Sequence, residues 1–348
     1  MHPETLTWLR LYRSENVGPA IFFRLIERFG SAGAALDALA GRLKPCPAEP
    51  AQAELDALDR IGGEVLLAED PRFPPALKIL EIAPLLSVHG DASLLAKPSV
   101  ALVGTREASI NGRKLAFNLA AELGKAGYPI VSGLARGIDT AAHQGGLATG
   151  TVAVVAGGVD IIYPPENARL YQQIAETGCV VSEMPPGLHP TAQHFPRRNR
   201  LIAGIAQGVV VVEAKLRSGS LITARFALEQ GRDIFAVPGS PLDPRSAGPN
   251  SLIKQGAILV ECAGDILDGL GAPSLPEPPA PPTVSDDGPS LSAAHEMVEK
   301  SLTVTAVTVD EILRQCQLSP STLSLVLLEL ELAGRLLRHP DHSISLRA

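Results

Sequence analysis

Short, almost wholly apolar runs separated by segments of helical periodicity dominate the middle of the chain. Seven such runs recur between residues 85 and 237, at Leu85–Val88, Val100–Val103, Ile130–Val131, Val152–Val155, Val180–Val181, Val209–Val212 and Ile234–Val237. Strands that are apolar on both sides are typical of a parallel sheet with helices on both faces. The helices expected between them are residues 111–126, 139–147, 168–175, 201–206 and 221–230. We therefore predict an α/β fold over residues 69–270, a Rossmann-like, doubly wound and mostly parallel sheet.

Smaller segments flank the predicted sheet. Residues 1–68 show helical spacing of Leu and Phe around a Val17-Gly18-Pro19 turn, which indicates a SAM-like or helix-hairpin-helix-like domain or a plain α-hairpin. Residues 271–290 are rich in Pro, Ser and Asp and predict a semi-extended linker. Residues 291–348 predict two helices followed by a two-stranded wing, which is the pattern of a winged-helix domain.

Charge and cysteine usage limit the class of protein. The net charge is −7, yet residues 100–230 hold 12 Lys and Arg against 9 Asp and Glu, so a local basic site is compatible with an acidic chain. The four cysteines are far apart and lack zinc-site spacing, which predicts reduced thiols and no metal. The first residues lack a signal-peptide pattern, and no run of about 18 apolar residues occurs, so we expect a cytoplasmic protein without a membrane segment.

Three segments with Gly or Ser next to a cation follow predicted strands. The first is Gly104-Thr105-Arg106, the second runs from Gly133 to Arg136, and the third contains Lys215 and Ser218-Gly219-Ser220. The carboxyl ends of parallel strands form the ligand-binding edge of such sheets. A small-residue turn before a helix presents backbone N–H groups to an anion, and an adjacent arginine favours phosphate. The three loops therefore predict a site for several phosphates.

A basic cluster precedes the sixth of the seven apolar runs. Arg197, Arg198, Asn199 and Arg200 follow Phe195. Arginines contact phosphates without reading base identity, whereas an aromatic ring can stack on a base. Phe195 is equally compatible with a stacking platform and with a core residue beneath the loop.

Motifs for nucleotide cofactors are missing from these loops. None of them follows G-x-G-x-x-G or G-x-x-x-x-G-K-[ST], so we expect no dinucleotide or Walker-type site and no cofactor. Several Gly/Ser-Arg loops in a row suit a polyphosphate strand better than a single nucleotide.

Four titratable residues near the predicted site are candidates for catalysis: His143, His194, Glu183 and Glu213. Asp139 is expected to be the N-cap of its helix, and His143 an orienting or capping residue rather than a general base. Glu183 and Glu213 each follow an apolar run and can serve as an acid–base pair or fix the arginine side chains. We prefer the second role, because neighbouring cations hold carboxylates ionised.

A series of motifs resembles one known family. VGTREAS, SGLARGIDTAAH, AGGVDIIYPPEN, SEMPPG, FPRRNRLIAG, VVEAKLRSGSLITARFALEQGRDIFAVPG and GPNSLIKQGA follow one another in that order. This series is similar to the bacterial DNA-processing protein A (DprA/Smf) family over residues 69–270. Members of that family often carry an N-terminal SAM-like domain and a C-terminal winged helix as well.

The resemblance implies a non-enzymatic protein that binds single-stranded DNA without sequence preference. It also implies a homodimer that loads the RecA recombinase onto the strand in natural transformation. The family's phosphate-gripping motif falls on Gly104, Thr105 and Arg106, and its basic cluster on residues 197–200. The other motif loops carry Gly133, Arg136, Lys215, Ser218, Gly219 and Ser220.

Two further interpretations concern the winged helix and a rival activity. Residues 319–331 contain no Lys or Arg, so we expect the winged helix to bind protein or to pack rather than to read duplex DNA. The fold and the Gly-rich turn also look like nucleotide phosphoribohydrolases of the lysine-decarboxylase-like type. The turn at residues 217–221 lacks their PGG sequence, and Glu229 is the only acid soon after it.

Overall fold

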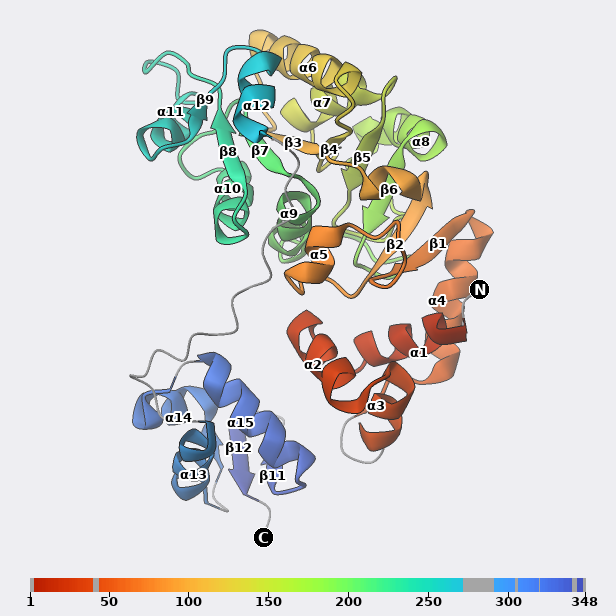
Figure 1. Cartoon of the computed structure of the whole chain (residues 1–348), viewed down its shortest axis with the longest axis vertical. Helices are drawn as coiled ribbons and strands as arrows, with labels where there is room; N and C mark the ends of the chain where they lie inside the picture. Colours follow the sequence, from red (N-terminus) through yellow and green to blue (C-terminus); the bar gives the residue numbers. More distant parts are fainter. Residues whose placement is uncertain are drawn as a thin grey trace. The chain divides into compact units, whose positions relative to one another are not determined.

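The computed structural model describes residues 3–39, 44–271, 291–303, 306–318, 320–339 and 343–346 (Figure 1). The chain divides into two compact units, residues 1–33 with 46–278 and residues 34–45 with 279–348, which we describe separately. The predicted linker covers residues 271–290, of which residues 272–290 lie outside the described residues. None of the helices in the described ranges combines the length and the apolar composition that a bilayer span requires.

A nine-stranded sheet forms the centre of the first unit. Its strands lie in the order β1-β2-β6-β5-β4-β3-β7-β8-β9. The strands from β6 to β9 in this order are parallel, whereas β2 pairs antiparallel with β6 and β1 antiparallel with β2. This pairing confirms the predicted Rossmann-like, mostly parallel sheet. The strand bounds are β1 Gly63–Leu67, β2 Leu85–Gly90, β3 Val100–Val103, β4 Ile130–Ser132, β5 Thr151–Val154, β6 Cys179–Ser182, β7 Gly208–Val211, β8 Asp233–Ala236 and β9 Ile258–Leu259.

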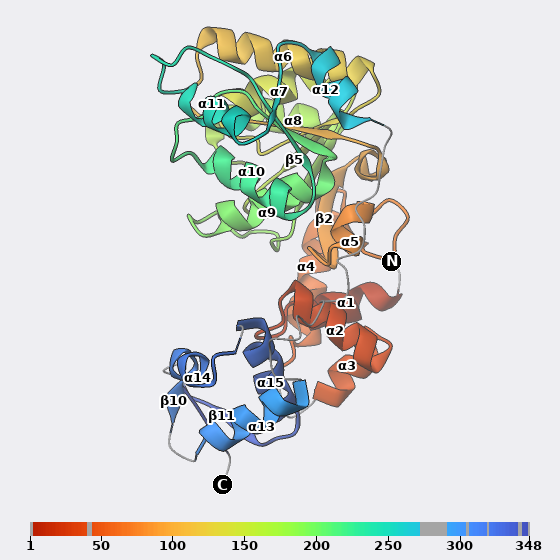
Figure 2. The same ribbon diagram turned by 60° about the vertical axis from the view of Figure 1, so that its left-hand side comes forward.

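Helices cover both faces of this sheet. Helices α6, α7 and α12 gather on one face, and α9 and α10 pack together on the other (Figures 1 and 2). The helix bounds are α5 Pro75–Ile79, α6 Ile110–Lys125, α7 Ile138–Gly146, α8 Ala168–Thr177, α9 His194–Ile205, α10 Gly219–Glu229, α11 Ala247–Lys254 and α12 Ala263–Leu270, with short 3₁₀ turns at Ala92–Ala96 and Pro165–Asn167.

Burial on both faces explains why these strands are largely apolar. Every residue of β3, β5, β6 and β7 is buried. Leu102 and Val210 of the sheet pack with Leu119 of α6 in one core cluster. Because neither face meets water, these strands lack the alternation of polar and apolar residues that a half-exposed strand shows.

The chain reverses its direction of travel across the sheet between β3 and β7. From β3 it winds outward through β4 and β5 to β6, and from β7 it winds the other way to β8 and β9. The loops after β3 and β7 therefore leave the sheet on opposite faces and open a crevice between them. Such a switch point is where open α/β sheets bind ligands.

Helices precede the sheet. Their bounds are α1 Pro3–Tyr12, α2 Pro19–Phe29, α3 Ala32–Leu39 and α4 Ala48–Arg60. Pro19 opens α2, and Gly30, at φ 77°, ends it. Trp8 packs against Phe22, with ring centroids 5.0 Å apart.

The second unit contains a winged helix. Its elements are α13 Leu291–Ser301, β10 Val307–Thr308, α14 Val309–Cys316, α15 Pro320–Leu332, β11 Leu336–Arg338 and β12 Ser343–Leu346. The three strands pair antiparallel in the order β10-β12-β11. Ile312, Leu323 and Ile344 share its apolar core. The predicted helices and two-stranded wing are confirmed.

Three local features differ from the sequence predictions. Strand β1 lies within residues 1–68, which were expected to be helical. Helix α9 begins at His194 rather than near Leu201, because its first turns carry the basic cluster and lack apolar periodicity. The N-cap of α7 is Gly137, at φ 82°, so the prediction for Asp139 is wrong. The Asp139 carboxylate instead accepts hydrogen bonds from the N–H groups of Gly133 and Ala135.

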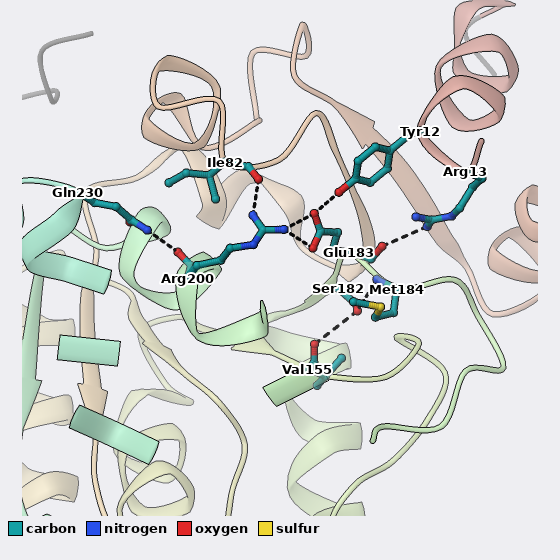
Figure 3. A network of polar contacts seen from close by, with 9 residues as sticks. All are labelled: Tyr12, Arg13, Ile82, Val155, Ser182, Glu183, Met184, Arg200 and Gln230. Atoms are coloured by element: carbon teal, nitrogen blue, oxygen red, sulfur yellow. Dashed lines mark hydrogen bonds and ion pairs between the residues drawn. The ribbon is translucent and has the colours of Figure 1, made fainter. Parts of the chain in front are cut away.

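A buried carboxylate connects the N-terminal helices to the sheet (Figure 3). Glu183, at the end of β6, is 2% exposed and accepts hydrogen bonds from Arg200 and Tyr12. The Arg200 guanidinium also donates to the carbonyl oxygen of Ile82. Arg13 donates to the backbone oxygen of Glu183 at 3.1 Å. The prediction that Glu183 fixes an arginine side chain is confirmed.

Replacing Arg200 should destabilise the fold. Arg200→Ala leaves the Glu183 carboxylate buried with one cationic partner fewer, so we expect a loss of about 3–5 kcal/mol in the free energy of unfolding. The exposed Arg197 is the matched control, and Arg197→Ala should change stability by less than about 0.5 kcal/mol. Urea unfolding followed by fluorescence of the single tryptophan, Trp8, measures both. Equal small losses would contradict a structural role for Arg200.

The buried imidazole of His143 is held neutral. Its Nε2 accepts from the N–H of Leu134 at 3.3 Å, and its Nδ1 lies 2.7 Å from Thr151 Oγ1. An N–H can only donate, so the ring proton sits on Nδ1 and is donated to Thr151. Burial and the positive charge of Arg198 lower the pKa of His143 to about 3. The expected orienting role agrees with this geometry.

The neutral His143 should make stability depend on pH. The pKa of His143 is lower in the folded chain than the value near 6.5 in the unfolded chain. The contribution of His143 to the free energy of unfolding is therefore complete above pH 6.5 and is lost as the pH falls toward 3. The stability deficit of His143→Gln relative to the parent chain should therefore shrink by up to about 1.4 kcal/mol per pH unit below pH 6.5. Urea unfolding between pH 7.5 and 5 measures this difference. The exposed His189, changed to Gln, is the control, and a constant deficit for His143→Gln would refute the assignment.

Candidate nucleic-acid interface

The first loop of the site follows β3 at the switch point. The N–H of Thr105 donates to the backbone oxygen of Glu213 at 2.7 Å, which joins the loops after β3 and β7. The Glu213 carboxylate accepts from the backbone N–H and the hydroxyl of Ser109, at 2.9 and 2.6 Å. Glu213 thus holds a serine rather than an arginine, so the prediction made for its side chain is wrong. Arg106 extends from this loop and is exposed.

The second loop follows β4 and rests on Arg198. The Nη1 of Arg198 donates to the carbonyl oxygens of Gly133 and Val154, each at 2.5 Å. A Cβ on Gly133 would lie 2.5 Å from the same nitrogen, so only glycine permits this approach. Arg136, three residues further on, is exposed. The loop therefore holds one buried cation at its base and one exposed cation at its rim.

The third loop follows β7 and leads into α10. Ser218 is the N-cap of α10, and its hydroxyl accepts from the N–H of Ser220. The side-chain amide of Asn199 donates to the carbonyl oxygen of Gly219 at 3.2 Å. Lys215 is exposed and lies 3.0 Å from a carboxylate oxygen of Glu107. The N–H of Leu221 donates to the carbonyl oxygen of Ser218 at 3.1 Å, so Ser218 caps two N–H groups at this helix start beside the β3 loop.

The three loops surround one pocket. Its volume is about 370 Å³. Ten of the predicted site residues line it: Gly104, Thr105, Arg106, Arg136, Phe195, Arg198, Asn199, Ser218, Gly219 and Ser220. A second pocket of about 210 Å³ adjoins it, sharing Arg106 and Phe195 and including Gly133. Arg197, Arg200 and Lys215 line neither pocket.

The residues of the basic cluster, 197–200, differ in burial because they lie in helix α9. Successive residues of a helix point about 100° apart, so neighbouring side chains enter different surroundings. Arg197 is exposed, whereas Arg198 and Asn199 are 7% and 8% exposed. Arg200 points to Glu183, as described above. One exposed cation therefore remains where the sequence predicted three.

Phe195 lies between two cations. The guanidinium carbons of Arg106 and Arg198 are 5.3 and 5.9 Å from its ring centroid. Tyr163, from the loop after β5, is 44% exposed, and its ring centroid lies 5.8 Å from that of Phe195. Phe195 is neither a core residue nor a free platform, but one side of a half-buried aromatic pair.

Sequence reasoning missed three residues at the rim. Tyr163 and Glu166 belong to the loop after β5, and Glu107 follows Arg106. Glu166 lies 3.6 Å from Arg136, and the Lys215 ammonium beside Glu107 lowers the pKa of that carboxyl. The loop after β5 also ends a parallel strand, and this shared position was the signal that could have identified Tyr163 and Glu166.

Two buried titratable side chains, Arg198 and Asp139, lie beneath the pocket. Burial lowers the pKa of Arg198 to about 10, so this side chain remains a cation at neutral pH. Burial also raises the pKa of Asp139, while the charge of Arg198 and backbone N–H groups oppose that rise. Arg198 therefore supplies a fixed positive charge under the loops.

Three family models match successive parts of the chain. The family described as "DNA recombination-mediator protein A" matches residues 64–271, a DprA-like N-terminal HHH domain matches residues 2–57, and a DprA winged helix domain matches residues 276–342. The N-terminal match favours the helix-hairpin-helix interpretation over a plain α-hairpin.

Relatives and solved structures agree with these matches. Protein Smf of Escherichia coli (strain K12) is 38% identical over 314 residues, 88% of this chain and 84% of the relative. DNA processing protein DprA of Streptococcus pneumoniae (strain ATCC BAA-255 / R6) is 47% identical over 201 residues, 57% of this chain and 71% of the relative.

Two solved structures share the fold. The X-ray structure of DprA from Streptococcus pneumoniae matches with a TM-score of 0.60 and 38% identity, over 72% of this chain and 82% of that chain. A structure of DprA from Helicobacter pylori, described as giving insights into its single-stranded DNA binding mode, matches with a TM-score of 0.55 and 32% identity, over 60% and 95%. The chain belongs to the DNA recombination-mediator protein A (DprA/Smf) family.

Proposed function

We propose that this protein binds single-stranded DNA without sequence preference, in the pocket between the loops after β3, β4 and β7. One observation carries the proposal: three strand-end loops converge at the switch point around exposed Arg106 and Arg136, with an aromatic pair beside them. Guanidinium groups and N–H groups grip phosphates, which are identical in every sequence.

The aromatic pair favours an unpaired strand over a duplex. Bases of a duplex are stacked on each other, whereas bases of a single strand can stack on a protein ring at about 1–3 kcal/mol each. Phe195 and Tyr163 line the smaller pocket next to the cations. A strand whose phosphates reach Arg106 can therefore turn a base toward the two rings.

Relatives support this assignment. The Helicobacter pylori protein, which is 32% identical, is described as binding single-stranded DNA, and the family name describes recombination mediators. We further propose that the chain is cytoplasmic, acts as a homodimer and delivers RecA recombinase to the bound strand. The two binding sites of a dimer can hold one strand at the same time, which raises the effective affinity without new kinds of contact.

A hydrolase function is less well supported. A phosphoribohydrolase requires an acid close after the glycine-rich turn, and Glu229 is the last residue of α10, where it pairs with Arg225 on the exposed surface at 2.8 Å. Release of free base from nucleoside monophosphates would restore this alternative.

Binding of an unstructured, fluorescently labelled oligonucleotide at several salt concentrations tests the proposal. We expect tight, steeply salt-dependent binding that a duplex competitor does not displace. Absence of binding at low salt would refute the function.

Arg106 should contribute directly to strand affinity. Arg106→Ala removes a charge-assisted phosphate contact, so we expect binding to weaken by about 1–3 kcal/mol and the salt slope to fall by about one unit. Anisotropy titrations of the same oligonucleotide measure both quantities. Arg225→Ala, an equal change of charge on the exposed surface of α10, should leave both unchanged. Unchanged affinity of Arg106→Ala would remove this residue from the site.

The rim carboxylates should oppose binding. Glu107 and Glu166 pair with Lys215 and Arg136, so they compete with phosphate for these cations. We expect Glu107→Gln and Glu166→Gln to tighten binding at low salt and to lose their effect at high salt, because screening weakens exposed charges. The exposed Glu122 of α6 provides the control, as Glu122→Gln. Weaker binding of either rim variant would show that its acid orients the cation instead of masking it.

A further inference from the structure

An exposed stripe on α6 has no evident role in the fold. Ile110, Arg113, Lys114 and Phe117 are spaced three and four residues apart and so lie on one helical face. Ile110 and Phe117 are 77% and 43% exposed, and the two basic residues between them are also exposed. The buried face of α6 is made by other residues, Ala116, Leu119, Ala120 and Leu123.

The stripe borders a groove between α6 and α7, which lie side by side in both views (Figures 1 and 2). The groove has a volume of about 440 Å³. Arg113, Lys114 and Phe117 line it from α6, and Thr140 and Gln144 line it from α7. The residues that line this groove include cations, amides and a hydroxyl, and none of them is acidic.

Arg136 connects this groove to the candidate interface. Its side chain lines the groove and both pockets at the ends of the strands. A phosphate chain held at Arg106 and Arg136 can therefore continue along α6 without leaving cationic surface. Exposed apolar rings next to cations are what sequence-tolerant strand binding uses, whereas a protein-docking surface is depleted of charge at its centre.

We propose that the groove between α6 and α7 is a second subsite for the same single strand, beyond the strand-end pocket. Arg113 and Lys114 contact phosphates there, and Phe117 stacks on a base. This inference rests on the proposed function and extends it, because it predicts where the strand goes after Arg136 and that affinity grows with strand length.

The experiment compares oligothymidines of about 5 and about 20 nucleotides, a range that brackets the site sizes of single-strand binders. The double variant Arg113→Gln/Lys114→Gln should weaken binding of the long strand at least about fivefold at low salt and lower its salt slope by about 1.4 units. Binding of the short strand should stay unchanged. Phe117→Ala should weaken the long strand about five- to tenfold with its salt slope unchanged.

Lys125→Gln is the matched control, because Lys125 lies on the same helix about 16 Å further along its axis. It should leave both strands unaffected. If neither Arg113→Gln/Lys114→Gln nor Phe117→Ala weakens the long strand, the subsite does not exist. Loss of RecA delivery by these variants with unaltered strand binding would assign the stripe to a protein partner and also overturn the proposal. Failure of the proposed function looks different, because the parent chain would then bind neither strand.

Discussion

The buried guanidinium of Arg198 is the interaction on which the candidate interface depends. It donates to carbonyl oxygens at the ends of two neighbouring strands, and its chain neighbour Asn199 holds the start of α10. Loops from three strands are thereby fixed relative to one another before any ligand arrives. A buried cation with these bonds is costly to displace, so the exposed Arg136, three residues after Gly133, projects from a rigid base. The loop of Arg106 is fixed separately, by the hydrogen bond from the N–H of Thr105 to the backbone oxygen of Glu213. Gly133 is part of the same constraint, because any side chain there would meet the guanidinium.

The structure uses adjacent arginines for different purposes. Arg198 organises the pocket from below, whereas Arg200 neutralises Glu183 and so joins the N-terminal helices to the antiparallel edge of the sheet. The cations that remain for a ligand are few and partly masked by Glu107 and Glu166. An acidic chain of net charge −7 can therefore present a local phosphate site, and the rim acids set how strongly that site competes with salt.

Much of the fold was predictable from local sequence. The runs at Val100–Val103 and Val209–Val212 predicted buried parallel strands because burial on both faces removes polar alternation. The Gly104 and Ser218 loops were recognised because each combines small residues and a nearby cation at the end of a predicted strand. The predicted start of helix α9 was several residues too far along the chain, because its first turns carry cations instead of an apolar stripe. Strand β1 was not predicted, because it lies in a region of helical spacing.

The sequence by itself determined the sheet, its flanking modules, the family and the set of strand-end loops, because these follow from periodicity and from motifs in a fixed order. Only the tertiary structure decided which of Arg197, Arg198 and Arg200 faces solvent, that Glu213 holds Ser109, and that Tyr163 stands beside Phe195. The physical reason is that burial and pairing depend on partners distant in the chain. A sequence specifies which groups are charged, and packing specifies which of those charges a ligand can reach.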